Sequence, residues 1–263
     1  MRNLGYNDPV KYVPSICFPD NEKPKLDLLE QLFREWHQYF ANNGLALEKH
    51  TADDMVFDGF YPHYFSQKKR ILFIGREPRG ISGRNYLDEL YPCYHDTKCV
   101  GNRPLNSHAF HRRVIRIAYG IVNGLPKWHD IPKATKIGDT FGVADGLSFA
   151  FMNISKLSND GGWQADWPVI NASHSLSREF QCKEVAILEP QVVITMKLEN
   201  TIYSLGEMTP VHDSNLAKSF WLGSGGNRSL LIETSHFSAR RGDNAGFYEP
   251  IRDAIRRSEM AAL

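Results

Sequence analysis

Three polar side chains with complementary chemistry each follow closely on a short apolar stretch of this sequence. They are Glu77, Asn153 and His236. A carboxamide offers both a donor and an acceptor, and an imidazole can donate to a developing negative charge. A carboxylate can orient water or stabilise a positive charge. Together these groups suit recognition of one small, planar, polar ligand, and we expect them to converge.

The elements that must position these side chains are four apolar runs, at 71–74, 149–154, 192–196 and 229–232. Runs that are mainly apolar, without alternation, predict strands covered on both faces. Strands alternating with helices predict a parallel sheet between helical layers, whose ligand site lies beyond the carboxyl ends of the strands. Amphipathic periodicity predicts helices at about 29–43, 107–124, 171–188, 198–205 and 247–255.

The predicted fold is therefore α/β, a three-layer α/β/α sandwich around a central, mainly parallel four-stranded sheet. We expect one domain over residues 1–263. Residues 1–66 form an N-terminal helical extension packed on the core, and residues 67–258 form that core. Residues 79–106 combine Gly and Pro with Tyr, Asn and Asp without clear periodicity. This pattern predicts a long loop, and such loops inside compact domains are often functional.

The overall composition excludes several classes of protein. The 31 Lys and Arg against 30 Asp and Glu give a formal net charge of +1, so any nucleic-acid surface is a local patch. No apolar run approaches the length of a membrane span, and the N-terminus does not read as a secretory signal, so we expect a cytoplasmic monomer without membrane contact. The four scattered cysteines fit a reducing compartment. We expect no metal and no cofactor.

The order of four segments resembles a known family. The segments are ILFIGREP, FAFMNISK, EPQVVITM and IETSHFSARR, within residues 70–245. A strand followed by a G-x-[DNE]-P type turn, a strand ending in Asn and a late His-x-Ser loop are similar to the uracil-DNA glycosylase superfamily. The resemblance implies a glycosylase-like α/β/α fold and hydrolysis of an N-glycosidic bond in DNA without a metal.

The resemblance also implies roles for particular residues. A base flipped out of single-stranded DNA or a damaged duplex would enter the crevice. Asn153 would read its polar edge, and His236 would stabilise the negative charge on the departing base. Glu77 would orient the water and offset positive charge on the sugar. The base pocket would also include Gly75, Arg76 and Pro78.

Two motifs depart from the best-known branch of that family, whose turn reads GQDPYH and whose late loop reads HPSPLS. Arg79 and Gly80 follow the proline here, and the late loop reads HFSARR. The uracil-specific Tyr is therefore replaced, and the residue that would wedge into the duplex falls at Arg240 or Arg241. An arginine can instead contact phosphate. The expected contacts to the nucleic-acid backbone are Arg79, Ser238, Arg240 and Arg241.

Other readings of the same residues stay open. Glu77 can cap a turn, Asn153 can end a strand, and His236 can be a surface histidine. The basic residues of the helix after residue 107 suit a solvent face. At the level of function, the alternatives are a non-catalytic module that binds a base or nucleic acid, and a hydrolase or transferase of small metabolites using Glu77 and His236 as an acid/base pair.

Overall fold

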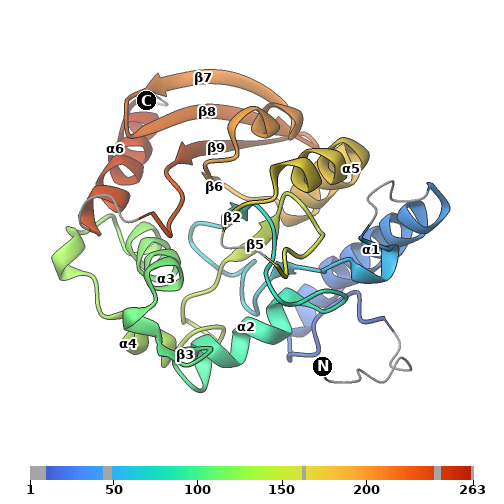
Figure 1. Cartoon of the computed structure of the whole chain (residues 1–263). Coiled ribbons are helices and arrows are strands. Elements are labelled where there is room, and N and C mark those ends of the chain that lie inside the picture. Colours follow the sequence, from blue (N-terminus) through green and yellow to red (C-terminus); the bar gives the residue numbers. More distant parts are fainter. Residues whose placement is uncertain (1–9, 44–48, 162–163, 240–243, 262–263) are drawn as a thin grey trace.

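A single mixed sheet forms the centre of the protein (Figure 1). The structure is a computed structural model that describes residues 10–43, 49–161, 164–239 and 244–261. The strands lie in the order β1-β5-β2-β6-β9-β8-β7. Their bounds are β1 Gly59–Phe60, β2 Ile71–Gly75, β5 Ala150–Asn153, β6 Val192–Met196, β7 Glu207–Asp213, β8 Ala217–Ser224 and β9 Asn227–Thr234.

The four predicted apolar runs form the parallel centre of this sheet, β5-β2-β6-β9. The prediction of an α/β fold with a mainly parallel sheet is confirmed, but the predicted count of four strands is wrong. Seven strands are present because β1 joins one edge and β8 and β7 extend the other, all antiparallel. The sequence did not predict the added strands because β1 is only two residues long and β7 is largely exposed, without an apolar run.

Helices cover both faces of the sheet, each over its own apolar cluster (Figure 1). Along β2, Ile71 and Phe73 belong to one cluster and Leu72 and Ile74 to the other, because strand side chains alternate between faces. The first face carries α2 Tyr86–His95, α3 Ala109–Val122, α4 Ala134–Gly138 and α6 Ala245–Ala261. The second carries α1 Lys23–Asn43 and α5 Trp167–Leu188, which pack on each other.

The predicted helices α1, α3, α5 and α6 are present, and the segment 198–205 forms a short 3-10 helix, Glu199–Ser204. The loop predicted over residues 79–106 is wrong from residue 86 onward. That part contains α2 and a small hairpin of β3 Cys99–Val100 and β4 Arg103–Pro104. Asn85 caps α2 by accepting from the N–H groups of Leu87 and Asp88. The sequence did not predict this helix because Pro92, which disfavours a helix interior, lies inside it.

The segment before β2 takes part in the sheet. Gly59 and Phe60 pair with Phe151 and Ala150 of β5, and Met55 forms an isolated bridge with Leu157. Asp58, next to β1, is buried against the end of β5. Within the described residues, no helix has the length and hydropathy needed to cross a membrane.

Candidate functional site

The carboxyl ends of the four parallel strands lie at one edge of the sheet. Asn153 of β5 is opposite Gly75 of β2, and Met196 of β6 is opposite Thr234 of β9. Glu77 and His236 each come two residues beyond this row. We call Glu77, Asn153 and His236, with the backbone of Gly75, the strand-end site.

Glu77 has a side chain that is only 3% exposed. Its Oε1 accepts from Arg79 Nη2 at 3.0 Å and from Asn159 Nδ2 at 3.4 Å. Its Oε2 is buried and has no partner among the described residues. Burial raises the pKa of this carboxyl above its ordinary value, although Arg79 and Asn159 oppose the shift. The turn therefore presents a desolvated carboxylate with one unused oxygen.

The backbone N–H of Asn153 is hydrogen-bonded, whereas its side-chain amide nitrogen has no partner among the described residues. Its N–H donates to Asp58 Oδ2 at 2.8 Å, and its buried Nδ2 has no partner within the described chain. Gly75 leaves room for this side chain, because a Cβ at that position would lie 2.9 Å from Asn153 Oδ1 and 3.1 Å from the Phe151 ring. An unpaired buried donor costs free energy, so it points to a ligand acceptor.

His236 is a neutral donor at the pH of the cell. Burial, with the positive charges of Arg76 and Arg79, lowers the pKa of His236 to about 4. Its Nδ1 accepts from the N–H of Ser238 at 3.2 Å, so the proton of the neutral ring lies on Nε2. The ring can therefore donate to a growing negative charge without itself carrying a charge.

The positive charges of Arg76 and Arg79 affect the pKa values of both Glu77 and His236. Arg79 pairs with Glu77 at 3.0 Å, and the charges of Arg76 and Arg79 both bear on the pKa of His236. Arg76 also acts on the pKa of Glu77. The charges of both arginines therefore act on the carboxyl group and on the imidazole.

Aromatic rings connect the two sides of the strand-end site. Phe110, in the first turn of α3, has its ring centroid 5.6 Å from that of His236 and 6.2 Å from that of Phe151. Tyr86 stacks on Phe151 at 4.8 Å with an interplanar angle of 12°. The sequence placed Phe110 only in a core stripe, because helical periodicity does not reveal which end of a helix reaches the strand ends.

The remaining predicted pocket residues lie around the turn. Arg76 donates from Nε to Lys197 O at 3.3 Å and lies over the Trp167 ring. Pro78 is buried, and its carbonyl accepts from Asn159 N–H at 2.9 Å. Arg79 and Ser238 are exposed, as a contact to a nucleic-acid backbone requires. Arg240 and Arg241 lie outside the described residues.

The loop that carries His236 is fastened to α3 by a buried arginine. Arg113 Nη1 donates to Phe237 O and, at 2.9 Å, to Ala239 O, and its Nε donates to Asn244 Oδ1 at 3.0 Å. The expectation of a basic solvent face on this helix is therefore wrong for Arg113, and also for the buried His111. Both are basic residues that serve packing and hydrogen bonding inside the molecule.

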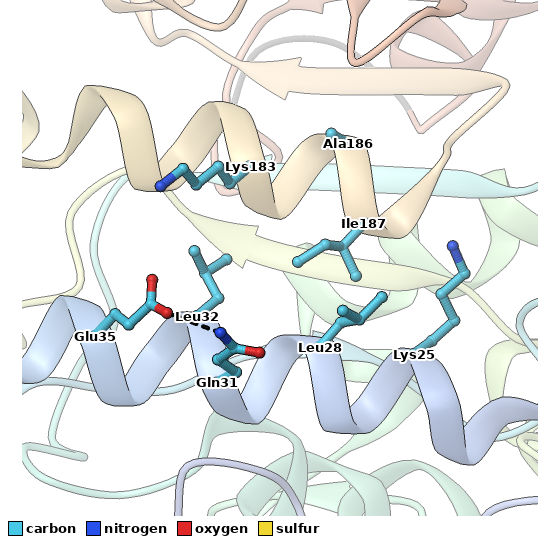
Figure 2. A pocket seen from close by; sticks show the side chains of 8 residues that line it. All are labelled: Lys25, Leu28, Gln31, Leu32, Glu35, Lys183, Ala186 and Ile187. Carbon is cyan, nitrogen blue, oxygen red and sulfur yellow. Dashed lines mark hydrogen bonds between the residues drawn. The ribbon is translucent and has the colours of Figure 1, made fainter.

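One hollow adjoins the strand-end site, and a second lies apart from it. One, of about 900 Å³, is lined by Ser158, Asn159 and Asp160 and by the start of α5, and it adjoins Glu77 through Asn159. The other, of about 370 Å³, is an open groove between α1 and α5, where Figure 2 shows Leu28 and Ile187 with charged side chains around them. Asn153 and His236 line neither hollow.

The arrangement joins a neutral donor, a desolvated carboxylate and an unpaired amide at one sheet edge. Such a set suits stabilisation of a charge separation in a polar ligand. Within the described part of the chain, no three His, Cys, Asp or Glu side chains are grouped to hold a metal ion. No protein-family model and no curated protein matches the sequence.

Proposed function

We propose that this chain is a divergent member of the uracil-DNA glycosylase superfamily, which binds a base flipped out of DNA and hydrolyses its N-glycosidic bond. The observation that supports the proposal is that Asn153, Glu77 and His236 each lie at or just beyond the carboxyl end of a strand of one parallel sheet. The unused Asn153 Nδ2 and Glu77 Oε2 are free to meet a ligand.

The chemistry follows from the electron flow of the reaction. The bond between C1′ and the base breaks with its electron pair leaving on the base, and water adds to C1′. The proton lost by that water neutralises the departed base. Glu77 stabilises the positive charge on the sugar and orients the water, while His236 donates from Nε2 to the base as negative charge grows. Asn153 Nδ2 donates to an acceptor on the edge of the base.

The state of His236 disfavours the alternative of an acid/base pair acting on a small metabolite. With a pKa of about 4, the ring holds no transferable second proton near neutral pH. It is also a weak base, because general catalysis is most effective when the pKa lies near the working pH. A donor role needs neither property.

One observation favours a second candidate, a module that binds a base or nucleic acid without cleaving it. Arg79 Nη2 lies 3.0 Å from Glu77 Oε1, so the carboxylate is already partly neutralised. A cation at this position competes with the positive sugar that catalysis would place there. Binding by such a module would be salt-dependent and would lose about one unit of slope for each phosphate-contacting arginine removed.

The test is release of free base from single-stranded and mismatched DNA that contains uracil or hypoxanthine. We expect Glu77→Gln to slow release by at least about 100-fold, because it removes the charge and keeps the shape. The matched control is Glu199→Gln, an exposed carboxylate that also acts on Arg76. If the wild type and Arg79→Ala bind the DNA but release no base, the non-catalytic module is favoured. If the protein neither binds the DNA nor releases a base, the glycosylase and the module are both contradicted.

A further inference from the structure

Three ionisable side chains form a fully buried network behind the strand-end site. Lys156 Nζ pairs with Asp58 Oδ1, and it lies 2.8 Å from Glu184 Oε2 and 3.2 Å from Glu184 Oε1. All three side chains are 0% exposed. Lys156 also lies over the rings of Phe33 and Trp36. We call these three residues the Asp58 network.

The Asp58 network joins three parts of the chain to the end of β5. Asp58 immediately precedes β1, Lys156 lies three residues after Asn153, and Glu184 is on α5. The second oxygen of Asp58, Oδ2, accepts the N–H of Asn153 at 2.8 Å. The network therefore acts directly on the backbone of a residue in the strand-end site.

Asp58 supplies an acceptor that the sheet lacks at this point. The pairing of β1 with β5 ends at Gly59 opposite Phe151, two residues before Asn153. On its other side β5 pairs with β2 up to Asn153 and Gly75. A buried N–H requires a partner, and the Asp58 carboxylate provides one where β1 stops.

The charges of the network balance only if one carboxyl keeps its proton. One ammonium and two carboxylates would leave a net negative charge in a fully buried site, which is strongly unfavourable. Asp58 receives donors from both Lys156 and Asn153, so each of its oxygens accepts a hydrogen bond. Burial raises the pKa of Glu184 well above its ordinary value, although Lys156 opposes the shift, and this favours the protonated form of Glu184.

We propose that Asp58, held by Lys156, is a positioning residue, which fixes the end of β5 and so aims the Asn153 amide at the ligand. Apolar residues of similar size would fill the same space at no loss of stability, since a buried ion pair is not in itself stabilising. They would not supply an oriented acceptor for Asn153 N–H. The effect on ligand affinity rests on the proposed function, whereas the hydrogen bond itself does not.

The first experiment measures the hydrogen bond in the wild-type protein by ¹H–¹⁵N NMR. A carboxylate acceptor moves an amide proton downfield, and burial protects it from exchange. We expect the Asn153 amide to be downfield and protected, to stay so in Glu184→Gln, and to move upfield in Asp58→Asn. An unprotected Asn153 amide in the wild type would overturn the proposal even if Asp58→Asn failed to fold.

The second experiment measures affinity for uracil-containing single-stranded DNA. We expect Asp58→Asn to weaken binding about tenfold, with a larger effect on KM than on kcat, and Glu184→Gln to bind as the wild type does. The matched control is Glu22→Gln, a buried carboxylate that accepts the N–H groups of His63 and Phe65 away from the site. That variant should lose stability and keep its affinity.

The outcomes separate the two proposals. If Asp58→Asn and Glu22→Gln lose similar stability and neither changes affinity, the Asp58 network is only structural and the inference fails. If the wild type binds no DNA and releases no base, the proposed function fails. In that case the NMR measurement still decides whether Asp58 holds Asn153.

Discussion

Buried polar atoms without a partner are rare in folded proteins because each costs free energy. Two such atoms, Asn153 Nδ2 and Glu77 Oε2, belong to the strand-end site. Next to them the backbone is fully satisfied, since Asn153 N–H binds Asp58 and Ile154 N–H binds Gly75 O. The contrast between a satisfied backbone and unsatisfied side chains is what a preorganised binding site requires.

Asn153→Ala should therefore separate function from stability. The side chain makes no hydrogen bond within the described residues, and its removal deletes an unsatisfied donor worth about 1–3 kcal/mol. This gain offsets the lost packing, so we expect the free energy of unfolding in urea to change by less than about 1 kcal/mol. Affinity for a base-containing ligand should fall at least about tenfold.

Asn85→Ala is the control for that variant. Asn85 is also buried with an unpaired Nδ2, but its Oδ1 caps α2. Its loss should cost about 1 kcal/mol of stability without affecting affinity. A large loss of stability in Asn153→Ala with unchanged affinity would show that Asn153 only ends its strand.

Sequence alone named the members of the strand-end site but not the residues around them. Glu77, Asn153 and His236 were found because each follows a recognisable apolar run, and the rule for parallel sheets places such residues at one edge. Asp58 was missed because the two-residue strand beside it has no periodicity to detect. Phe110 and Arg113 were missed because a helical pattern does not state which strand ends the helix reaches.

Helix α5 shows how a buried element can carry polar residues inward. Ser173, Gln181 and Glu184 are buried on it and bind Ser155, the carbonyl of Ile154 and Lys156 respectively. The apolar periodicity of the sequence located the helix correctly, but it would assign these polar residues to solvent. Their partners follow Asn153 in the chain, so α5 holds the segment after β5 in place.

Helix α3 holds the other side of the site, and two of its arginines allow a matched test. Arg113 binds Phe237 O and Ala239 O, beside His236, and Arg116 binds the carbonyls of Trp128 and Ile131, away from it. Each also lies over an aromatic ring. Replacement by Met keeps the apolar stem and removes the donors.

We expect both Arg113→Met and Arg116→Met to lower the free energy of unfolding by about 3 kcal/mol, because buried carbonyls lose charged donors. Only Arg113→Met should weaken ligand binding, since only this residue fastens the loop of His236. Thermal unfolding and affinity measured on the same preparations check this. Equal effects of the two variants on affinity would show that α3 acts through general stability alone.

The whole molecule is organised by one sheet that serves two apolar clusters. Four central strands were predictable because they are apolar on both faces. The antiparallel strands β8 and β7 were not predictable from the sequence. Only some of their side chains are buried, and that burial depends on the neighbouring strands. The tight connection from β8 to β9 runs through Gly225 and Gly226, both at positive φ.

Because the strand β2 contributes to both clusters, we expect the chain to unfold as one cooperative unit. Trp36 lies in the cluster under α1 and α5, and Trp128 packs on the opposite cluster. Single-tryptophan variants that keep one or the other therefore report on the two faces separately. Their fluorescence transitions in urea should share one midpoint, since neither cluster survives loss of the strands between them. Two separate midpoints would contradict a single domain and would mean that α1 and α5 with their cluster form a unit that melts independently of the rest.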